Sequence, residues 1–255
     1  IAALFGGLMT KVGIYACVRV FTLFFYHEPD ITHALFCIMA GLTLIGGSIG
    51  AVAYRDIRLI VTYNVVIAVG FILVGLSAGT LEALEGSIYY LVHDMIVKPL
   101  LFLIAGTMIA VTGTAKMNDM SGLIRNYPML GWMFFVVMLS LAGIPPFSGF
   151  IGKVLVGQGA IDAGSYILLA LAFISSIFVL YSLLRIFLQC FWGETIISTE
   201  DEMPMKKGWV IPCALLTAAT IALGLGAESL APYVKDAAET LINPQNYIDA
   251  VLYKD

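Results

Sequence analysis

The sequence predicts an all-α polytopic membrane protein with about eight transmembrane helices, some of them discontinuous. Of the 255 residues, 60% are hydrophobic and only 12% are charged. Short polar connections separate apolar runs of about 20 residues, the length that crosses roughly 30 Å of hydrocarbon. The strand alternation of a membrane barrel is absent, and helices satisfy their own backbone hydrogen bonds in lipid.

Eight apolar segments are long enough to cross a bilayer, or to cross it as two half-helices. They cover residues 2–25, 33–54, 58–78, 84–111, 128–143, 147–162, 165–191 and 209–231. None of the connections, which contain Pro, Gly, Asp and Asn, is long enough for a separate domain. We therefore expect one transmembrane domain over residues 1–255. Because residue 1 already lies in an apolar segment, we expect the chain to be the C-terminal part of a longer protein.

Several functional classes are disfavoured by the distribution of charge and cysteine. The net charge is −4, and the charges gather in connections and tails, so nucleic acid is not an expected partner. The four cysteines lie in apolar segments without CxxC spacing, which favours small buried hydrophobes over disulfides or metal ligands: Cys17, Cys37, Cys190 and Cys213. HEPDITH, residues 27–33, offers only two imidazoles and is typical of an interfacial turn. We expect no metal site and no cofactor.

Basic residues mark alternate connections between the apolar segments. Arg55, Arg58, Lys116 and Arg125 lie in these connections, and the positive-inside bias predicts that they face the cytoplasm.

Three lysines lie well inside apolar segments: Lys11, Lys98 and Lys153. A charge at the bilayer centre costs about 2.5–3.5 kcal/mol on insertion scales, unless it faces the interior of the bundle or internal water. A single such lysine can snorkel to the headgroups or form a structural pair. Three of them together indicate an ion path.

Asp94 and Lys98 are four residues apart, so a helix places them on one face and within reach of each other. Desolvation disfavours the charged form of a lysine and a carboxylate favours it, so such a pair can store a proton under electrostatic control. His93 lies about 100° around the helix from Asp94. It can relay protons or serve as a hydrogen-bonded packing residue, and the sequence leaves both interpretations open.

The stretch LSLAGIPPFSGFIGKVLV, residues 139–156, predicts a discontinuous helix. Pro145 and Pro146 stop a helix, glycines loosen it, and Lys153 follows within about two turns. Backbone groups freed by such a break can line a hydrated cavity that accommodates the charge. Around Lys11, three glycines permit a similar irregularity: Gly6, Gly7 and Gly13.

Four segments resemble the proton-translocating antiporter-like family, which is shared by Mrp-type sodium/proton antiporters and the membrane arm of respiratory complex I. They are IAALFGGLMTKVGIYACVR, YYLVHDMIVKPLLFLIAGT, NYPMLGWMFF and LSLAGIPPFSGFIGK, and the resemblance is to the Mrp branch. The resemblance implies a fourteen-helix fold with two inverted repeats, of which this chain represents helices seven to fourteen. The resemblance also implies that residues 1–56 are the end of the first repeat, that residues 57–192 form the second repeat, and that residues 193–255 contain the last helix and the tail.

The resemblance also implies roles for the intramembrane charges. Lys11 matches the broken-helix lysine of helix seven, Lys98 the central lysine of helix ten, and Lys153 the broken-helix residue of helix twelve. The family's glutamate partner for Lys11 lies upstream of residue 1, and no acidic residue lies in the first apolar segment, so we expect Lys11 to be buried alone in this chain. The family often has His where Asp94 stands, and a Ser-His or Ser-Gln pair at 67–68, so Asp94 is a candidate for the switchable group.

The implied function is that of a component of a multi-subunit secondary antiporter in the bacterial cell membrane, exchanging cytoplasmic Na⁺ for external H⁺. The proton pathway would comprise Lys11, His93, Asp94, Lys98 and Lys153, and the partners would be other Mrp subunits. One alternative is the antiporter-like subunit of complex I or of a membrane-bound hydrogenase. Another is a structural membrane subunit, whose lysines only hold the assembly together.

Overall fold

The computed structural model describes residues 1–25, 29–195 and 206–252. In chain order the elements are α1 (Ala2–Leu4), the π-helical η1 (Phe5–Met9), α2 (Thr10–Leu23), α3 (Pro29–Ala53), α4 (Ile57–Ala78), α5 (Leu81–Thr112), the 3₁₀ turn η2 (Met117–Asp119), α6 (Leu123–Asn126), α7 (Pro128–Ala142), α8 (Ser148–Asp162), α9 (Tyr166–Ile186), the π-helical η3 (Phe187–Phe191), α10 (Lys207–Leu225), α11 (Ala227–Ile242) and α12 (Pro244–Leu252). The described residues form no strand, and the only β-pairing among them is an isolated bridge between Asp56 and Lys116.

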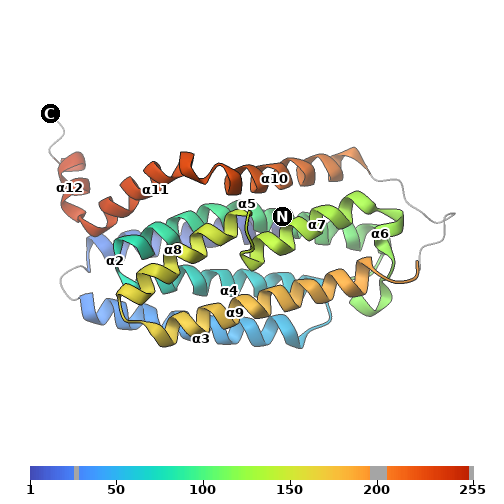
Figure 1. Cartoon of the computed structure of the whole chain (residues 1–255), viewed down its shortest axis with the longest axis horizontal. Helices are drawn as coiled ribbons and strands as arrows, with labels where there is room; N and C mark the ends of the chain where they lie inside the picture. Colours follow the sequence, from blue (N-terminus) through green and yellow to red (C-terminus); the bar gives the residue numbers. More distant parts are fainter. Residues whose placement is uncertain (26–28, 196–205, 253–255) are drawn as a thin grey trace.

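The prediction of an all-helical, multi-pass membrane protein is confirmed. Six helical segments in the described part of the chain are long and apolar enough to cross a bilayer: Ala2–Leu23, Asp30–Ala53, Ile57–Ala78, Leu81–Thr112, Tyr166–Phe191 and Lys207–Leu225. They run roughly along one common axis (Figure 1). The longest helix, α5, packs against α4, α8, α10 and α11 and forms the centre of the bundle.

The predicted break around Pro145 and Pro146 is confirmed. Helix α7 ends at Gly143, whose φ of 82° is left-handed, and α8 begins at Ser148. The two helices have only 15 residues each and lie end to end, with the connecting loop near the middle of the bundle (Figure 1). The segments expected at 128–143 and 147–162 are therefore the two halves of one discontinuous crossing.

The basic connections gather at one end of the bundle. The backbone amide of Ile57 donates to the carbonyl of Ala115 over 3.0 Å, and Met117 donates to Arg55 over 3.1 Å. Asp56 caps α4 by accepting from the Arg58 amide at 2.8 Å. These contacts tie the connections before α4 and after α5 together, and their cytoplasmic location remains a prediction.

The last apolar segment differs from the expected range of 209–231. Helix α10 ends at Leu225, and Gly226 separates it from α11. Hydropathy alone extended the segment because the residues that follow Gly226 are still mostly small or apolar. Helix α11 is amphipathic, with Val234 and Ala238 buried and Glu228, Lys235, Asp236 and Glu239 exposed. It continues onward from α10 along the bundle (Figure 1) and packs against α5 and α2.

Helices α5 and α8 approach closely because glycines line their contact. A Cβ added at Gly86 of α5 would lie 2.9 Å from the carbonyl carbon of Leu155. On α8, a Cβ at Gly152 would lie 3.1 Å from the backbone nitrogen of Tyr90. Small residues allow such approach in membrane bundles, where packing rather than the hydrophobic effect holds helices together. This contact fixes the position of α8, and with it Lys153, relative to α5.

We expect Gly86→Ala to destabilise the protein by about 1–3 kcal/mol, because the added methyl group would overlap the α8 backbone. Gly106→Ala is the matched control on the same helix, since nothing lies within 4 Å of its added Cβ. The control should have an unchanged or slightly higher melting temperature. Thermal denaturation of the full-length protein in detergent checks this, and equal melting temperatures for the two variants would contradict the close contact.

Candidate functional site

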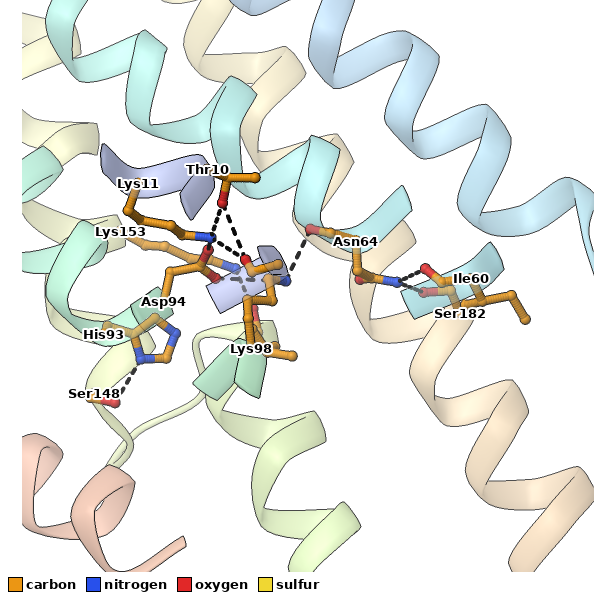
Figure 2. A network of polar contacts seen from close by, with 12 residues as sticks. Thr10, Lys11, Ile60, Asn64, His93, Asp94, Lys98, Ser148, Lys153 and Ser182 are labelled. Atoms are coloured by element: carbon orange, nitrogen blue, oxygen red, sulfur yellow. Dashed lines mark hydrogen bonds and ion pairs between the residues drawn. The ribbon is translucent and has the colours of Figure 1, made fainter. Parts of the chain in front are cut away.

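The buried charged residues of the bundle converge at its centre (Figure 2). The side chains of Lys11, Asp94, Lys98 and Lys153 are exposed by only 1%, 0%, 1% and 6%. They come from three elements, since α2 carries Lys11, α8 carries Lys153, and α5 carries both Asp94 and Lys98. Such charges are expensive in a membrane unless they are paired or hydrated, so their convergence marks this region as the candidate functional site.

Asp94 is shared by two lysines. Its Oδ2 lies 2.5 Å from Nζ of Lys11, and its Oδ1 lies 3.6 Å from Nζ of Lys98. The Asp94–Lys98 pair expected from the four-residue spacing is therefore present. The contact with Lys11 is the shorter one, so the two ammonium groups compete for a single carboxylate.

The expectation that Lys11 is buried alone was wrong. Asp94 supplies its carboxylate from α5, 83 positions along the chain. The first apolar segment contains no acidic residue, and helix packing brings the partner of Lys11 from a distant segment.

A π-helical segment directly precedes Lys11, as the glycines around it suggested. Nζ of Lys11 donates to the carbonyl of Gly6 at 3.1 Å and to Oγ1 of Thr10 at 3.3 Å. Gly6 and Gly7 bring this segment against α5, since an added Cβ would overlap the ring of Phe102 or of Pro99. Local π-helix frees backbone groups and is frequent at functional sites. Here it supplies an acceptor to the lysine and places it next to Asp94.

Lys153 binds the end of the preceding half-helix. Its Nζ donates to the carbonyls of Leu141 at 2.9 Å and Ala142 at 2.8 Å. These carbonyls belong to the last turn of α7, where the helix dipole attracts a positive charge. The broken crossing therefore provides the acceptors that its own lysine needs.

His93 faces the break rather than the carboxylate. Its Nδ1 lies 2.7 Å from Oγ of Ser148, the first residue of α8. Oγ of Ser148 lies 3.4 Å from Oγ of Ser140 in α7. This hydrogen bond links α5 to the start of α8 and places a titratable ring next to the break.

The sequence analysis did not single out four other polar residues of the site. Asn64, Ser140, Ser148 and Ser182 are all at most 1% exposed. The carbonyl of Asn64 accepts from Nζ of Lys98 at 2.9 Å. The available signal was a buried amide within the apolar run TYNVVIAVG, which costs free energy unless it is hydrogen-bonded.

The described residues contain neither a cluster of metal-ligand side chains nor a disulfide. No group of three or more potential metal ligands occurs among those residues, and His27 and Glu28 of HEPDITH lie outside them. All four cysteines are free. Cys190 and Cys213 are buried as expected, but Cys17 and Cys37 are exposed on the outside of the bundle.

The fold and the site together define a class of polytopic membrane proteins with broken helices and a central row of buried charges. A family model described as NADH:quinone oxidoreductase/Mrp antiporter, TM matches residues 1–179, and the chain belongs to this family.

Curated relatives share high identity with the chain. It is 50% identical over 252 residues to a subunit of the Na(+)/H(+) antiporter of Bacillus subtilis, and the match covers 99% of the chain and 51% of that protein. Identity to the corresponding subunit of Alkalihalophilus pseudofirmus is 44% over 253 residues, again 99% of the chain and 51% of the relative. The chain thus spans about half the length of the curated relatives it matches.

Solved structures share the fold. A chain of the Mrp complex from Dietzia sp. superposes with a TM-score of 0.90 at 31% identity, covering 98% of this chain and 55% of that one. A chain of respiratory complex I from Thermus thermophilus superposes with a TM-score of 0.80 at 27% identity, covering 93% and 51%.

We expect Asp94→Asn and Lys11→Met to be energetically coupled, because each removes the same short ion pair. In a double-mutant cycle on the stability of the full-length protein, the coupling should be about 0.5–3 kcal/mol. Glu85→Gln is the matched control, since Glu85 is on the same helix near Lys235 and Glu239 of α11. Combined with Lys11→Met, it should give additive effects. Additivity for Asp94→Asn as well would contradict the shared carboxylate.

Proposed function

We propose that the chain forms the C-terminal part of one component of a multi-subunit cation/proton antiporter, which exchanges cytoplasmic Na⁺ for external H⁺. The proton pathway uses Lys11, Asp94, Lys98 and Lys153, with His93 beside it. The observation that carries the proposal is the sharing of Asp94 by two buried lysines. The curated relatives, which are named as subunits of Na(+)/H(+) antiporters, support the ion assignment.

The shared carboxylate suggests how a proton moves along the row. With both lysines ionised, the triad carries one negative and two positive charges, which is costly in a medium of low dielectric constant. The lysine that holds Asp94 is stabilised as an ammonium group, and the other is the better proton donor. When Asp94 turns from Lys11 to Lys98, this preference reverses. A small side-chain motion would then shift the site of proton occupancy.

Lys153 enters the same buried cluster from α8 (Figure 2). It forms no ion pair with a carboxylate among the described residues. Two backbone carbonyls of α7 accept from its ammonium group, which also lies 5.8 Å from the centroid of the Phe71 ring. Its charge therefore depends on the α7 helix end and on repulsion by the other lysines. We propose that it passes protons between the cluster and the break.

The nearest alternative is the antiporter-like subunit of a redox-driven complex. The fold also matches a chain of an archaeal membrane-bound sulfane sulfur reductase, with a TM-score of 0.81 at 30% identity. The 50% identity to an antiporter subunit favours the antiporter. In either assembly, other subunits of a hetero-oligomeric membrane complex are the expected partners.

The assignment of repeats is also part of the proposal. Residues 57–192 would form the second inverted repeat, residues 1–56 the end of the first, and residues 193–255 the last helix and the tail. The broken crossing α7–α8 within the second repeat fits the helix-twelve role that the family resemblance implies.

We expect Lys153→Ala to reduce cation-dependent proton transport at least tenfold, because no other buried amine lies at the α7 end in the described bundle. The measurement is ΔpH dissipation by Na⁺ in everted vesicles that carry the complete complex. Lys116→Ala, at an exposed lysine, is the control and should transport normally.

Co-purification of the other subunits separates transport from assembly in this test. The structural-subunit alternative predicts that Lys153→Ala loses the complex and the transport together. Normal transport by an assembled Lys153→Ala complex would refute the pathway.

A further inference from the structure

We propose that Asn64 and Ser182 position the proton route between Lys98 and the end of the bundle that carries Arg55 and Arg58. The inference rests on the proposed antiport function and adds two residues to it. Both lie on the side of the cluster opposite to His93 and Ser148 (Figure 2).

The geometry of Lys98 directs its proton toward α4. Its Nζ is 2.9 Å from the carbonyl of Asn64 but 3.6 Å from Oδ1 of Asp94. The carboxylate is held more closely by Lys11, at 2.5 Å. In this arrangement Lys98 is the lysine with the weaker hold on Asp94, and its ammonium group already contacts the helix that leads to the basic end.

The side-chain amide of Asn64 has one hydrogen-bond acceptor, Oδ1, without a partner among the described residues. Its Nδ2 donates to the carbonyl of Ile60 at 2.9 Å and to Oγ of Ser182 at 3.2 Å. Oδ1 itself is fully buried. An unsatisfied buried acceptor costs about 1–3 kcal/mol. A water molecule that bridges to Lys98 would satisfy it and would carry the proton.

One further polar side chain, Arg185, lies between Ser182 and the basic end of the bundle. Asn64 is seven residues from the first residue of α4, Ile57, which corresponds to about 10 Å of helix. On α9, Arg185 lies one turn beyond Ser182 and donates to the carbonyl of Val52 at 2.9 Å. Arg185 is only half-buried, so this polar side chain lies near the surface of the described bundle.

A purely structural role for the pair is the competing explanation. Amides and hydroxyls do link membrane helices, and the Asn64–Ser182 bond joins α4 to α9. That bond engages only the nitrogen of the amide and leaves the oxygen unpaired in the interior of the described bundle. Linking the helices therefore accounts for Ser182 but not for the unpaired Oδ1 of Asn64, a residue whose backbone carbonyl accepts from Lys98.

The test compares Asn64→Leu and Ser182→Ala with Ser175→Ala in the complete complex. Ser175 is a buried serine on α9 that donates to its own helix, as Ser182 also does, but its hydrogen bond does not involve Asn64. Initial rates of Na⁺-driven proton movement in everted vesicles are measured against pH and against Na⁺ concentration. The titratable and charged groups that bear on Lys98 are unchanged in all variants: Lys11, His93, Asp94 and Lys153.

We expect Asn64→Leu to lower the maximal rate of proton movement about tenfold, because a residue that positions the proton route is lost. The pH at which the rate is half-maximal should also shift. The Na⁺ concentration for half-maximal rate should not change. Ser182→Ala should show a smaller effect in the same direction, and Ser175→Ala none. Asn64→Ser, which restores an oxygen, should recover part of the rate.

Two results would overturn the inference. One is wild-type transport and an unchanged pH profile in Asn64→Leu. The other is a loss of rate that only follows the loss of assembled complex, with the pH profile unchanged. If Lys153→Ala is inactive in the same vesicles, either result rejects the Asn64 route alone. If Lys153→Ala transports normally, the antiport pathway itself is rejected.

Discussion

The site depends on one carboxylate placed between two ammonium groups inside a membrane bundle. Asp94 is the acidic residue that contacts the buried lysines, and its two oxygens point to Lys11 and Lys98. Removing one partner of a buried ion pair costs about 3–5 kcal/mol, because the other charge is left uncompensated. The packing of the N-terminal helical segment, through η1, against α5 is therefore tied to the charge state of the site. The same three side chains, Lys11, Asp94 and Lys98, therefore affect both the stability of the protein and the proton chemistry of the site.

The two irregular segments solve the same chemical problem. An ammonium group has three hydrogen-bond donors, whereas each carbonyl in the interior of a regular helix already accepts one hydrogen bond from the helix itself. The π-helical η1 supplies the carbonyl of Gly6 to Lys11, and the end of α7 supplies two carbonyls to Lys153. For Lys11 and Lys153, the irregular segment supplies backbone acceptors, whereas Lys98 donates to a carbonyl of the regular helix α4.

Sequence reasoning found what depends on spacing within one helix. It predicted the pairing of Asp94 with Lys98, the break around Pro145 and the irregularity near Lys11. It did not find the Lys11–Asp94 contact, because spacing along the chain does not indicate which helices pack side by side. Asn64 was missed for the same reason. Its neighbours in sequence are apolar, and only the approach of α5 and α9 gives it polar ones.

The contact of Gly7 with Pro99 has an evolutionary consequence. A side chain at position 7 would overlap the proline ring, whereas a smaller residue at position 99 would leave room for it. Substitutions at these two positions must therefore occur in a fixed order, with Pro99 replaced first and Gly7 second. Lineages that keep the proline should keep the glycine, although the two residues lie 92 positions apart in the chain. The pair should be visible as a one-directional dependence when many homologous sequences are compared.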